Sequence, residues 1–170
     1  MGEPGAFAGA TVLVCGAGVA GASAVRALLS IGSRVLLAER DESEVVTTLV
    51  AAGAQWIGSP DVPPDGVDVV VTSPGWRPDH PLLVAASERE LPVIGELELA
   101  WRLRGPDAPP WLVVTGTNGK TTTVRMLESI LRAAGRRTLA VGHVGEPVIV
   151  AVLAGDAYDV GAVGGWWLQL

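Results

Sequence analysis

Residues 12–23 read VLVCGAGVAGAS, and this stretch decides the fold of the first part of the chain. A short apolar run, Thr11–Cys15, leads into the glycines of Gly16–Gly21, and a helical pattern, Ala22–Ile31, follows. Glycines spaced G-x-G-x-x-G between a strand and a helix allow a tight turn and present backbone amides to an anion. The stretch therefore predicts a dinucleotide-type α/β unit whose loop contacts a phosphate group.

The alternation of apolar runs and amphipathic helices continues beyond this loop. Further strands are expected at Val35–Ala38, Val67–Thr72 and 91–95, and further helices at Val45–Ala52, 80–90 and 96–103. This β-α alternation is typical of a Rossmann-like, doubly wound parallel sheet. We assign it to residues 1–104, and the proline- and glycine-rich stretch GPDAPP, residues 105–110, to a linker.

A second α/β unit is predicted after the linker, over residues 111–170. Its expected strands are Trp111–Thr115, Thr138–Val141 and Val160–Val163, and its expected helices are Thr121–Ala134 and Pro147–Leu153. Three strands with open edges make a poor stand-alone sheet. We therefore expect this unit to be the truncated start of a larger domain.

Composition excludes several classes of protein. The 170 residues carry a net charge of −6 without a Lys/Arg cluster, so neither a nucleic-acid partner nor an anionic membrane surface is expected. The single cysteine, Cys15, excludes a disulfide framework. No apolar run reaches the roughly 18 residues of a membrane helix, and the N-terminus lacks a signal-peptide pattern. A monomeric, cytoplasmic protein is expected.

The ligand of the first loop is left open by its own motif. Glu39 ends the second strand, where dinucleotide folds bind a ribose, which favours NAD or FAD. Against this, Arg40 follows immediately, and no hydride-transfer residues are recognisable downstream. Two further alternatives remain at this point: the glycines serve only helix packing, and Arg40 is a solvated loop residue.

A second glycine-rich loop, VVTGTNGKTTT at residues 113–123, predicts a site for ATP. Only two residues separate Gly116 from Gly119, whereas the usual P-loop has four before its Gly-Lys pair. The mechanics still correspond: the amides form an anion nest, Lys120 meets the β/γ-phosphates, and the Thr121 hydroxyl ligates Mg²⁺. The expected ATP-binding residues are Gly116, Thr117, Asn118, Gly119, Lys120, Thr121 and Thr122. Lys120 and Thr121 are the catalytic candidates, and Thr121 is the metal ligand.

The shortened loop G-T-N-G-K-T resembles the ATP loop of the Mur ligase family. The resemblance covers nearly the whole chain through GAGVAGASA, VTSPGWRPDHPLL, VIGELELAW and VGHVGEP, and the SPG turn with GELEL points to the D-glutamate-adding (MurD) branch. It implies an ATP- and Mg²⁺-dependent ligase of peptidoglycan precursor synthesis, and hence of cell-wall formation, cell shape and cell division. The implied reaction joins D-glutamate to UDP-N-acetylmuramoyl-L-alanine through an acyl phosphate.

The resemblance also implies different tasks for the two loops. The first would hold the UDP end of the sugar-nucleotide substrate, and the second would hold ATP. The implied substrate contacts are Val19, Ala20, Gly21, Arg40, Ser73, Pro74, Gly75 and His143. His143 departs from the family, which reads G-N-[IV]-G where this chain reads GHVG.

The last residues depart further from the family pattern. The family reads approximately V-E-L-S-S-F-Q-L, whereas this chain reads VGGWWLQL. Gly164 takes the place of a magnesium-binding glutamate, and Trp166 and Trp167 replace two serines. The family's modified lysine and its C-terminal, amino-acid-binding domain have no counterpart before Leu170. We therefore expect the 170-residue chain alone to be an inactive ligase fragment. The alternatives are a non-catalytic nucleotide-binding paralogue, a chain completed by another polypeptide, and an NAD(P)-binding oxidoreductase domain.

Overall fold

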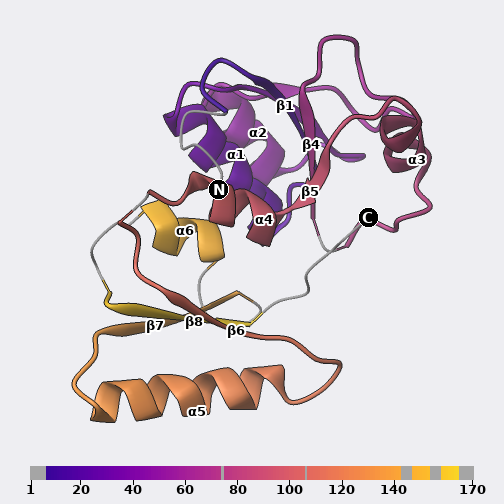
Figure 1. The fold of residues 1–170 in the computed structure, drawn as a ribbon. Helices are drawn as coiled ribbons and strands as arrows, with labels where there is room; N and C mark the ends of the chain where they lie inside the picture. The colour runs from indigo at the N-terminus through magenta and orange to yellow at the C-terminus, as the bar shows by residue number, and fades with distance from the viewer. Residues whose placement is uncertain (1–6, 74, 106, 143–146, 154–157, 165–170) are drawn as a thin grey trace.

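The computed structural model describes residues 7–73, 75–105, 107–142, 147–153 and 158–164. Two parallel β-sheets organise these residues (Figure 1). The strands of the first sheet are β1 Thr11–Cys15, β2 Arg34–Ala38, β3 Gln55–Trp56, β4 Val69–Thr72 and β5 Val93–Gly95. They lie in the order β3-β2-β1-β4-β5, and every neighbouring pair is parallel. The expected Rossmann-like α/β architecture is confirmed.

Helices cover both faces of this sheet because its central strands are apolar on both sides. The helices are α1 Val19–Ser30, α2 Glu44–Ala51, α3 Pro81–Glu88 and α4 Glu96–Leu103. Val12 and Val14 of β1 pack in one apolar cluster with α1, α2 and α4, whereas Leu13 and Cys15 face a second cluster that contains α3. This alternation is the period-2 pattern of a strand buried on both faces. We call this sheet with its four helices the first unit.

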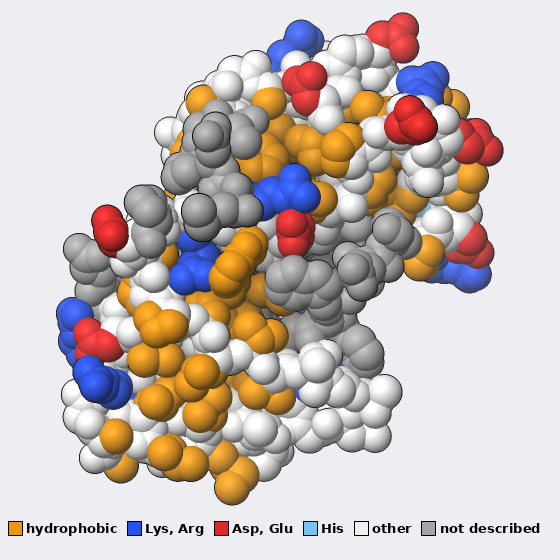
Figure 2. Space-filling model, in the orientation of Figure 1, with side chains coloured by type: hydrophobic (Ala, Val, Ile, Leu, Met, Phe, Trp, Pro, Cys, Tyr) orange, Lys and Arg blue, Asp and Glu red, His pale blue; other side chains and the backbone are white. Residues whose placement is uncertain are grey.

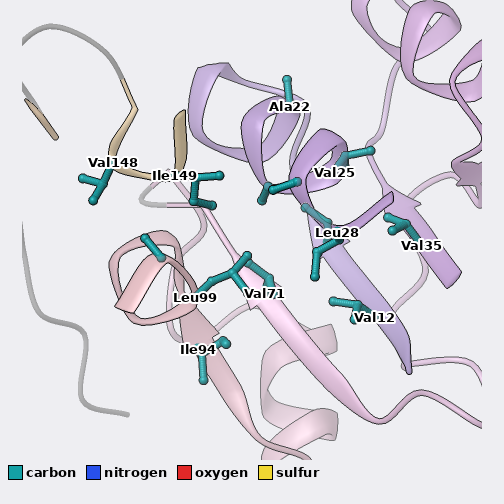
Figure 3. Packing of buried hydrophobic residues seen from close by; sticks show 14 of the residues in the cluster. Val12, Ala22, Val25, Leu28, Val35, Val71, Ile94, Leu99, Val148 and Ile149 are labelled. Carbon is teal, nitrogen blue, oxygen red and sulfur yellow. The ribbon is translucent and has the colours of Figure 1, made fainter. Parts of the chain in front are cut away.

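The second unit is smaller. Its strands β6 Trp111–Val114, β7 Thr138–Gly142 and β8 Val160–Gly164 lie in the order β6-β8-β7, all parallel. Helix α5, Lys120–Ala133, covers one side of this sheet, and α6, Val148–Leu153, lies on the side that faces the first unit (Figure 1). Helix α6 packs against α1 and α4. Its buried Val148 and Ile149 therefore belong to the same apolar cluster as Leu99 of α4 (Figure 3).

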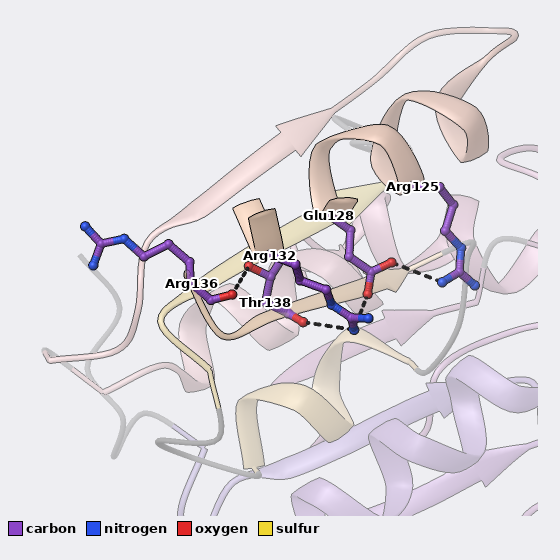
Figure 4. A network of polar contacts seen from close by, with 5 residues as sticks. All are labelled: Arg125, Glu128, Arg132, Arg136 and Thr138. Carbon is purple, nitrogen blue, oxygen red and sulfur yellow. Dashed lines mark hydrogen bonds and ion pairs between the residues drawn. The ribbon is translucent and has the colours of Figure 1, made fainter. Parts of the chain in front are cut away.

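A buried carboxylate of α5 is paired with two arginines of the same helix. Glu128 is only 8% exposed, and it pairs with Arg125 at 3.1 Å and Arg132 at 2.7 Å. Arg132 also donates to the carbonyl of Thr138, the first residue of β7 (Figure 4). Two guanidinium groups compensate the desolvation of this single charge. The network orients the helix whose first residue is Lys120.

The structure contains every strand and helix expected from the sequence, with ends displaced by at most a few residues. It adds β3, a two-residue strand at the sheet edge that is too short to produce a periodic pattern. The division at residues 105–110 remains a prediction, since α6 joins the apolar cluster of the first unit. Within the described part of the chain, no helix combines the length and apolar character needed to cross a membrane.

Candidate functional site

The first glycine loop lies where the strand order of the first sheet reverses. In the order β3-β2-β1-β4-β5 the reversal falls between β1 and β4, and open parallel sheets bind ligands at such a point. The loop follows β1, and Ser73 directly follows β4. The Ser73 amide donates to the Cys15 carbonyl at 3.2 Å. Two segments predicted from separate motifs, 16–21 and 73–75, therefore meet here, although Pro74 lies outside the described residues.

Two glycines of this loop have different roles. A Cβ on Gly21 would lie 1.9 Å from the Gly16 carbonyl oxygen, so the close approach of helix and loop requires glycine at this position. Gly18 has φ −64°, and nothing lies within 4 Å of the place its Cβ would take. The packing role is therefore correct for Gly21, whereas Gly18 borders open space.

Helix α1 begins at this open space with an anion-attracting end. Gly18 is its N-cap and gives no side-chain hydrogen bond, and the first turn carries no acidic residue. The first amides of a helix lack partners within the helix, and the helix dipole adds positive potential there. Val19, in this turn, is 76% exposed despite its apolar side chain. This end of α1 is chemically suited to an anionic ligand.

The Ser73 hydroxyl points toward the same loop. Its Oγ is buried without a hydrogen-bond partner in the described part of the chain. It lies 3.1 Å from the place of a Cβ on Gly16 and 3.0 Å from that on Gly21. A buried hydroxyl without a partner costs roughly 1–3 kcal/mol. A ligand oxygen at the loop is one means of satisfying it.

Glu39, which the motif would offer to a ribose, instead contacts the glycine loop. Its Oε2 accepts from the Ala17 amide at 2.8 Å, and its Oε1 accepts from the Arg40 amide at 2.9 Å. The carboxylate thus stabilises the loop conformation. This orientation weakens the argument for a dinucleotide that rested on the position of Glu39.

A cleft of about 420 Å³ opens beside the loop, between the end of β2 and the segment that leads into α3. Its lining residues are Glu39, Arg40, Ser59, Gly75, Trp76, Arg77, Asp79, His80 and Pro81. Arg40 and Gly75 are predicted site residues, whereas Trp76 and Ser59 were missed. Trp76 packs on His80 with ring centroids 4.3 Å apart. Trp76 could have been predicted from its position in the sequence, because it directly follows the SPG turn at the end of a strand, and the residues there border this cleft.

The second loop joins β6 to α5 and is held by its own lysine. Gly116 and Gly119 have φ of 145° and 77°, a region that favours glycine. Lys120 Nζ donates to the Gly116 carbonyl, which lies at the other end of the loop. Gly119, the N-cap of α5, provides no side-chain hydrogen bond, and Thr121 and Thr122 are exposed. The predicted ATP residues are thus contiguous at a helix start, as a phosphate nest requires.

The strand ends beside this loop carry glycines. Gly164 ends β8, and it pairs with Val114 of β6 and Gly142 of β7. A Cβ on Gly142 would lie 2.0 Å from the Gly164 carbonyl oxygen, so the backbones meet without side chains between them. The described residues contain no cluster of three or more His, Cys, Asp or Glu side chains able to hold a metal. His143, Trp166 and Trp167 lie outside the described residues.

Comparisons with known proteins agree with the motifs. Residues 114–156 match the Mur ligase middle domain. The chain is 55% identical over 162 residues to the UDP-N-acetylmuramoylalanine--D-glutamate ligase of Thermobifida fusca, which covers 91% of this chain and 35% of that protein. It is 45% identical over 168 residues to the ligase of the same name from Streptomyces coelicolor, covering 94% and 36%. The chain therefore spans about a third of the length of these curated relatives.

Solved structures show the same fold. The UDP-N-acetylmuramate-alanine ligase of Thermotoga maritima gives a TM-score of 0.51 at 24% identity, covering 92% of this chain and 36% of that one. A murein peptide ligase of Psychrobacter arcticus gives 0.54 at 18% identity, covering 92% and 37%. At these identities the likeness concerns the fold alone. With the sequence relatives beside it, the chain belongs to the Mur ligase family and matches about a third of a D-glutamate-adding member.

Proposed function

We propose that this chain is the nucleotide-binding part of an ATP-dependent, amide-forming ligase of peptidoglycan precursor synthesis. The protein would add D-glutamate to UDP-N-acetylmuramoyl-L-alanine. One observation carries the proposal: a chain 55% identical to such a ligase presents two glycine loops, each at the carboxyl end of a parallel strand in its own sheet. Two anion sites in one chain fit a reaction between two phosphate-bearing substrates.

The first loop would hold the diphosphate of the UDP-sugar. The amides at the start of α1, near Val19, Ala20 and Gly21, would face its oxygens, and the Ser73 hydroxyl would gain a partner. Arg40 lines the adjacent cleft, where it would meet the uridine. Pro74 and Gly75 are also proposed to contact the UDP-sugar.

The second loop would hold Mg·ATP. Residues Gly116–Thr122 would surround the phosphates, and Lys120 would exchange the Gly116 carbonyl for a phosphate oxygen. The residues present fit a Mg²⁺ ion bound chiefly by phosphate oxygens and water, because Thr121 offers one exposed hydroxyl and Gly164 offers no ligand. When bound, the ion would neutralise charge on the phosphates.

The proposed chemistry proceeds in two displacements. A carboxylate oxygen of the substrate attacks the γ-phosphorus, the bond to the β-phosphate oxygen breaks, and ADP leaves. The amine of D-glutamate then attacks the acyl carbon, loses a proton and expels phosphate. Lys120 would stabilise charge on the transferring phosphoryl group. His143 is proposed to border the reacting centre.

Ligand-dependent stability tests this assignment. Thermal unfolding is followed with UDP-N-acetylmuramoyl-L-alanine or Mg·ATP, each at about 100 times its dissociation constant, where a bound ligand adds about 2.7 kcal/mol. NAD⁺ is added in parallel at the higher of these two concentrations. The UDP-sugar and Mg·ATP are expected to raise Tm, and NAD⁺ is expected to leave it unchanged. Stabilisation by NAD⁺ alone would contradict the proposal and favour an oxidoreductase domain.

Nucleotide binding without ligation is the second candidate, and Gly164 favours it. A glycine at the end of β8 gives the metal no carboxylate at the strand next to the loop. A Cβ there would lie 3.1 Å from Val124 Cγ2, a tight contact that the methyl group must yield slightly to accommodate. Once circular dichroism shows that they fold, Gly164→Glu should increase the Mg²⁺-dependence of ATP binding, and Gly164→Gln is the uncharged control. Equal Mg²⁺-dependence in both variants would show that position 164 does not reach the metal.

A further inference from the structure

An arginine lies over two neighbouring indoles where the first unit joins the second. Arg104 follows α4, Trp101 belongs to α4, and Trp111 is the first residue of β6. The Arg104 Cζ atom lies 4.4 Å from the Trp101 ring centroid and 4.6 Å from that of Trp111. The two rings meet edge to face, with centroids 5.6 Å apart. Three side chains from both ends of the linker therefore form one cluster, which we call the linker clasp.

The same guanidinium also forms hydrogen bonds with the backbone of the linker. Arg104 Nη2 donates to the carbonyls of Ala108 at 3.2 Å and Pro109 at 2.6 Å. The Ala108 amide donates to the Gly105 carbonyl at 3.1 Å in the same segment. A planar guanidinium can stack on rings and donate in its plane at once, which a lysine ammonium cannot.

The clasp holds this cation in a partly dehydrated place. Burial lowers the pKa of Arg104, although the electrostatic effect of Tyr158 acts in the opposite direction. Its Nε atom is buried without a hydrogen-bond partner among the described residues. Retaining a cation here has a cost that the ring contacts and the two carbonyls offset.

Trp111 connects the clasp to the second sheet, because its side chain packs against residues near and in β8. Its indole Nε1 contacts the Tyr158 hydroxyl at 3.4 Å, and a Cβ on Gly161 would lie 2.9 Å from its Cδ1 atom. Strand β6 then runs in register with β8 from Trp111 to Val114, and the second glycine loop follows directly. A shift of Trp111 would therefore move the whole strand and the start of the loop.

We propose that Arg104 is a positioning residue that sets the place of the second glycine loop relative to the first. The inference rests on the proposed function, in which a γ-phosphate and a carboxylate held by different units must meet. Misplacement of reacting groups by about 1 Å can cost on the order of 100-fold in rate. The clasp fixes the backbone connection between the two units at one end of their junction, and the packing of α6 against α1 and α4 holds the junction elsewhere. The clasp therefore contributes to the geometry that this meeting requires.

Distance measurements between two spin labels test the proposal on the whole chain without any ligand. Exposed Glu88 of α3 and Ser129 of α5 are each replaced by cysteine and labelled. The native Cys15 is buried, and burial raises its pKa to about 12, so it does not compete for the reagent. The unmodified clasp is expected to give a narrow distance distribution, and Arg104→Ala one that is about twofold wider or more, because the packing of α6 on α1 and α4 would then hold the junction alone.

Two further variants make the result specific. Arg104→Lys keeps the charge and loses the planar stacking, so it should also widen the distribution, and it provides the test if Arg104→Ala fails to fold. Arg26→Ala removes an equal charge from the exposed side of α1 and should leave the distribution narrow. A distribution that is equally narrow with and without Arg104, or already wide in the native chain, would overturn the inference.

Ligand titrations separate this inference from the proposed function. In Arg104→Ala, the dissociation constants for UDP-N-acetylmuramoyl-L-alanine and for Mg·ATP should each stay within about twofold of the native values, because the contacts described for the clasp involve α4, the linker, Trp111 and Tyr158 rather than loop residues. Failure of the native chain to bind either ligand would refute the proposed function, whatever the label distances show. A widened distribution with both affinities retained is the outcome expected of a positioning residue.

Discussion

The two glycine loops resemble each other in sequence and differ in their surroundings. The first follows β1, whose Val12, Leu13 and Val14 are completely buried between helices on both faces. The second follows β6, whose Leu112 and Val113 are 41% and 47% exposed. Figure 2 shows apolar side chains on the surface of the lower part of the molecule, which holds the second unit. The same local motif is thus built into a closed core in one unit and an open sheet in the other.

This difference indicates how each loop keeps its shape. The first is held by its surroundings, because the Ala17 amide donates to the Glu39 carboxylate and the Gly16 amide donates to the Ala38 carbonyl at the end of β2. The second is held mainly from within, through the bond of Lys120 to Gly116. We therefore expect changes in the first loop to affect folding more, and changes in the second to affect ligand binding more.

The largest effect is expected from Gly21→Ala. The added Cβ would lie 1.9 Å from the Gly16 carbonyl oxygen, so helix and loop must separate. We expect a loss of about 1–3 kcal/mol in the free energy of unfolding, measured by denaturant titration. Gly18→Ala is the matched control, because its Cβ would enter open space, and it should change stability by no more than about 0.5 kcal/mol. Equal losses in both variants would contradict the packing role of Gly21.

Lys120→Ala tests the second loop, where we expect an effect on ligand binding rather than on folding. Loss of a charged hydrogen bond to phosphate, worth about 1.5–3 kcal/mol, should weaken Mg·ATP binding roughly 10- to 100-fold by calorimetry. Stability without ligand should change little, because the loop is largely exposed. Affinity for the UDP-sugar is the internal control and should remain as in the native chain. Unchanged ATP affinity would mean that the second loop is not the ATP site.

Gly18→Val tests whether the open space at the first loop is ligand space. The larger side chain should overlap a diphosphate there and weaken UDP-sugar binding about tenfold or more, which is about 1.4 kcal/mol or more of binding free energy. Mg·ATP binding should be unaffected. If Gly18→Val bound the UDP-sugar normally while remaining folded, the diphosphate would lie elsewhere.

The smallest effect is expected at Glu96, where α4 meets α6. Burial raises the pKa of this carboxyl, although hydrogen bonds from the Ile149 and Val148 amides lower it. Because the pKa is higher in the folded state, folding is penalised once the pH exceeds the unfolded pKa, and the penalty is complete above the folded pKa. Glu96→Gln should therefore raise Tm slightly at pH 7, with the gain disappearing as the pH falls below the unfolded pKa. Glu98→Gln, on the same helix, is the control. A gain that persists in acid would exclude this explanation.

The sequence predicted most of the fold because each long element carries its own periodicity. Strand β3 was missed because Gln55 and Trp56 are too few to show a period. The orientation of Glu39 could not be predicted, since an acid at a strand end can bond a ribose or its own loop equally well. The cleft required tertiary structure, because Ser59 and Trp76 come together only when β2 and β4 end at one edge of the sheet.

The hydrogen bond from Lys120 to Gly116 has a consequence for chemical labelling. Lys120 is the only lysine in the chain, since the other 11 of its 12 basic residues are arginines. An amine-reactive reagent at moderately alkaline pH therefore has one side-chain target besides the N-terminus. The rate at which Lys120 is acylated would depend on whether its amine bonds to the Gly116 carbonyl or to a bound phosphate. Acylation with and without nucleotide would therefore report the occupancy of the second loop.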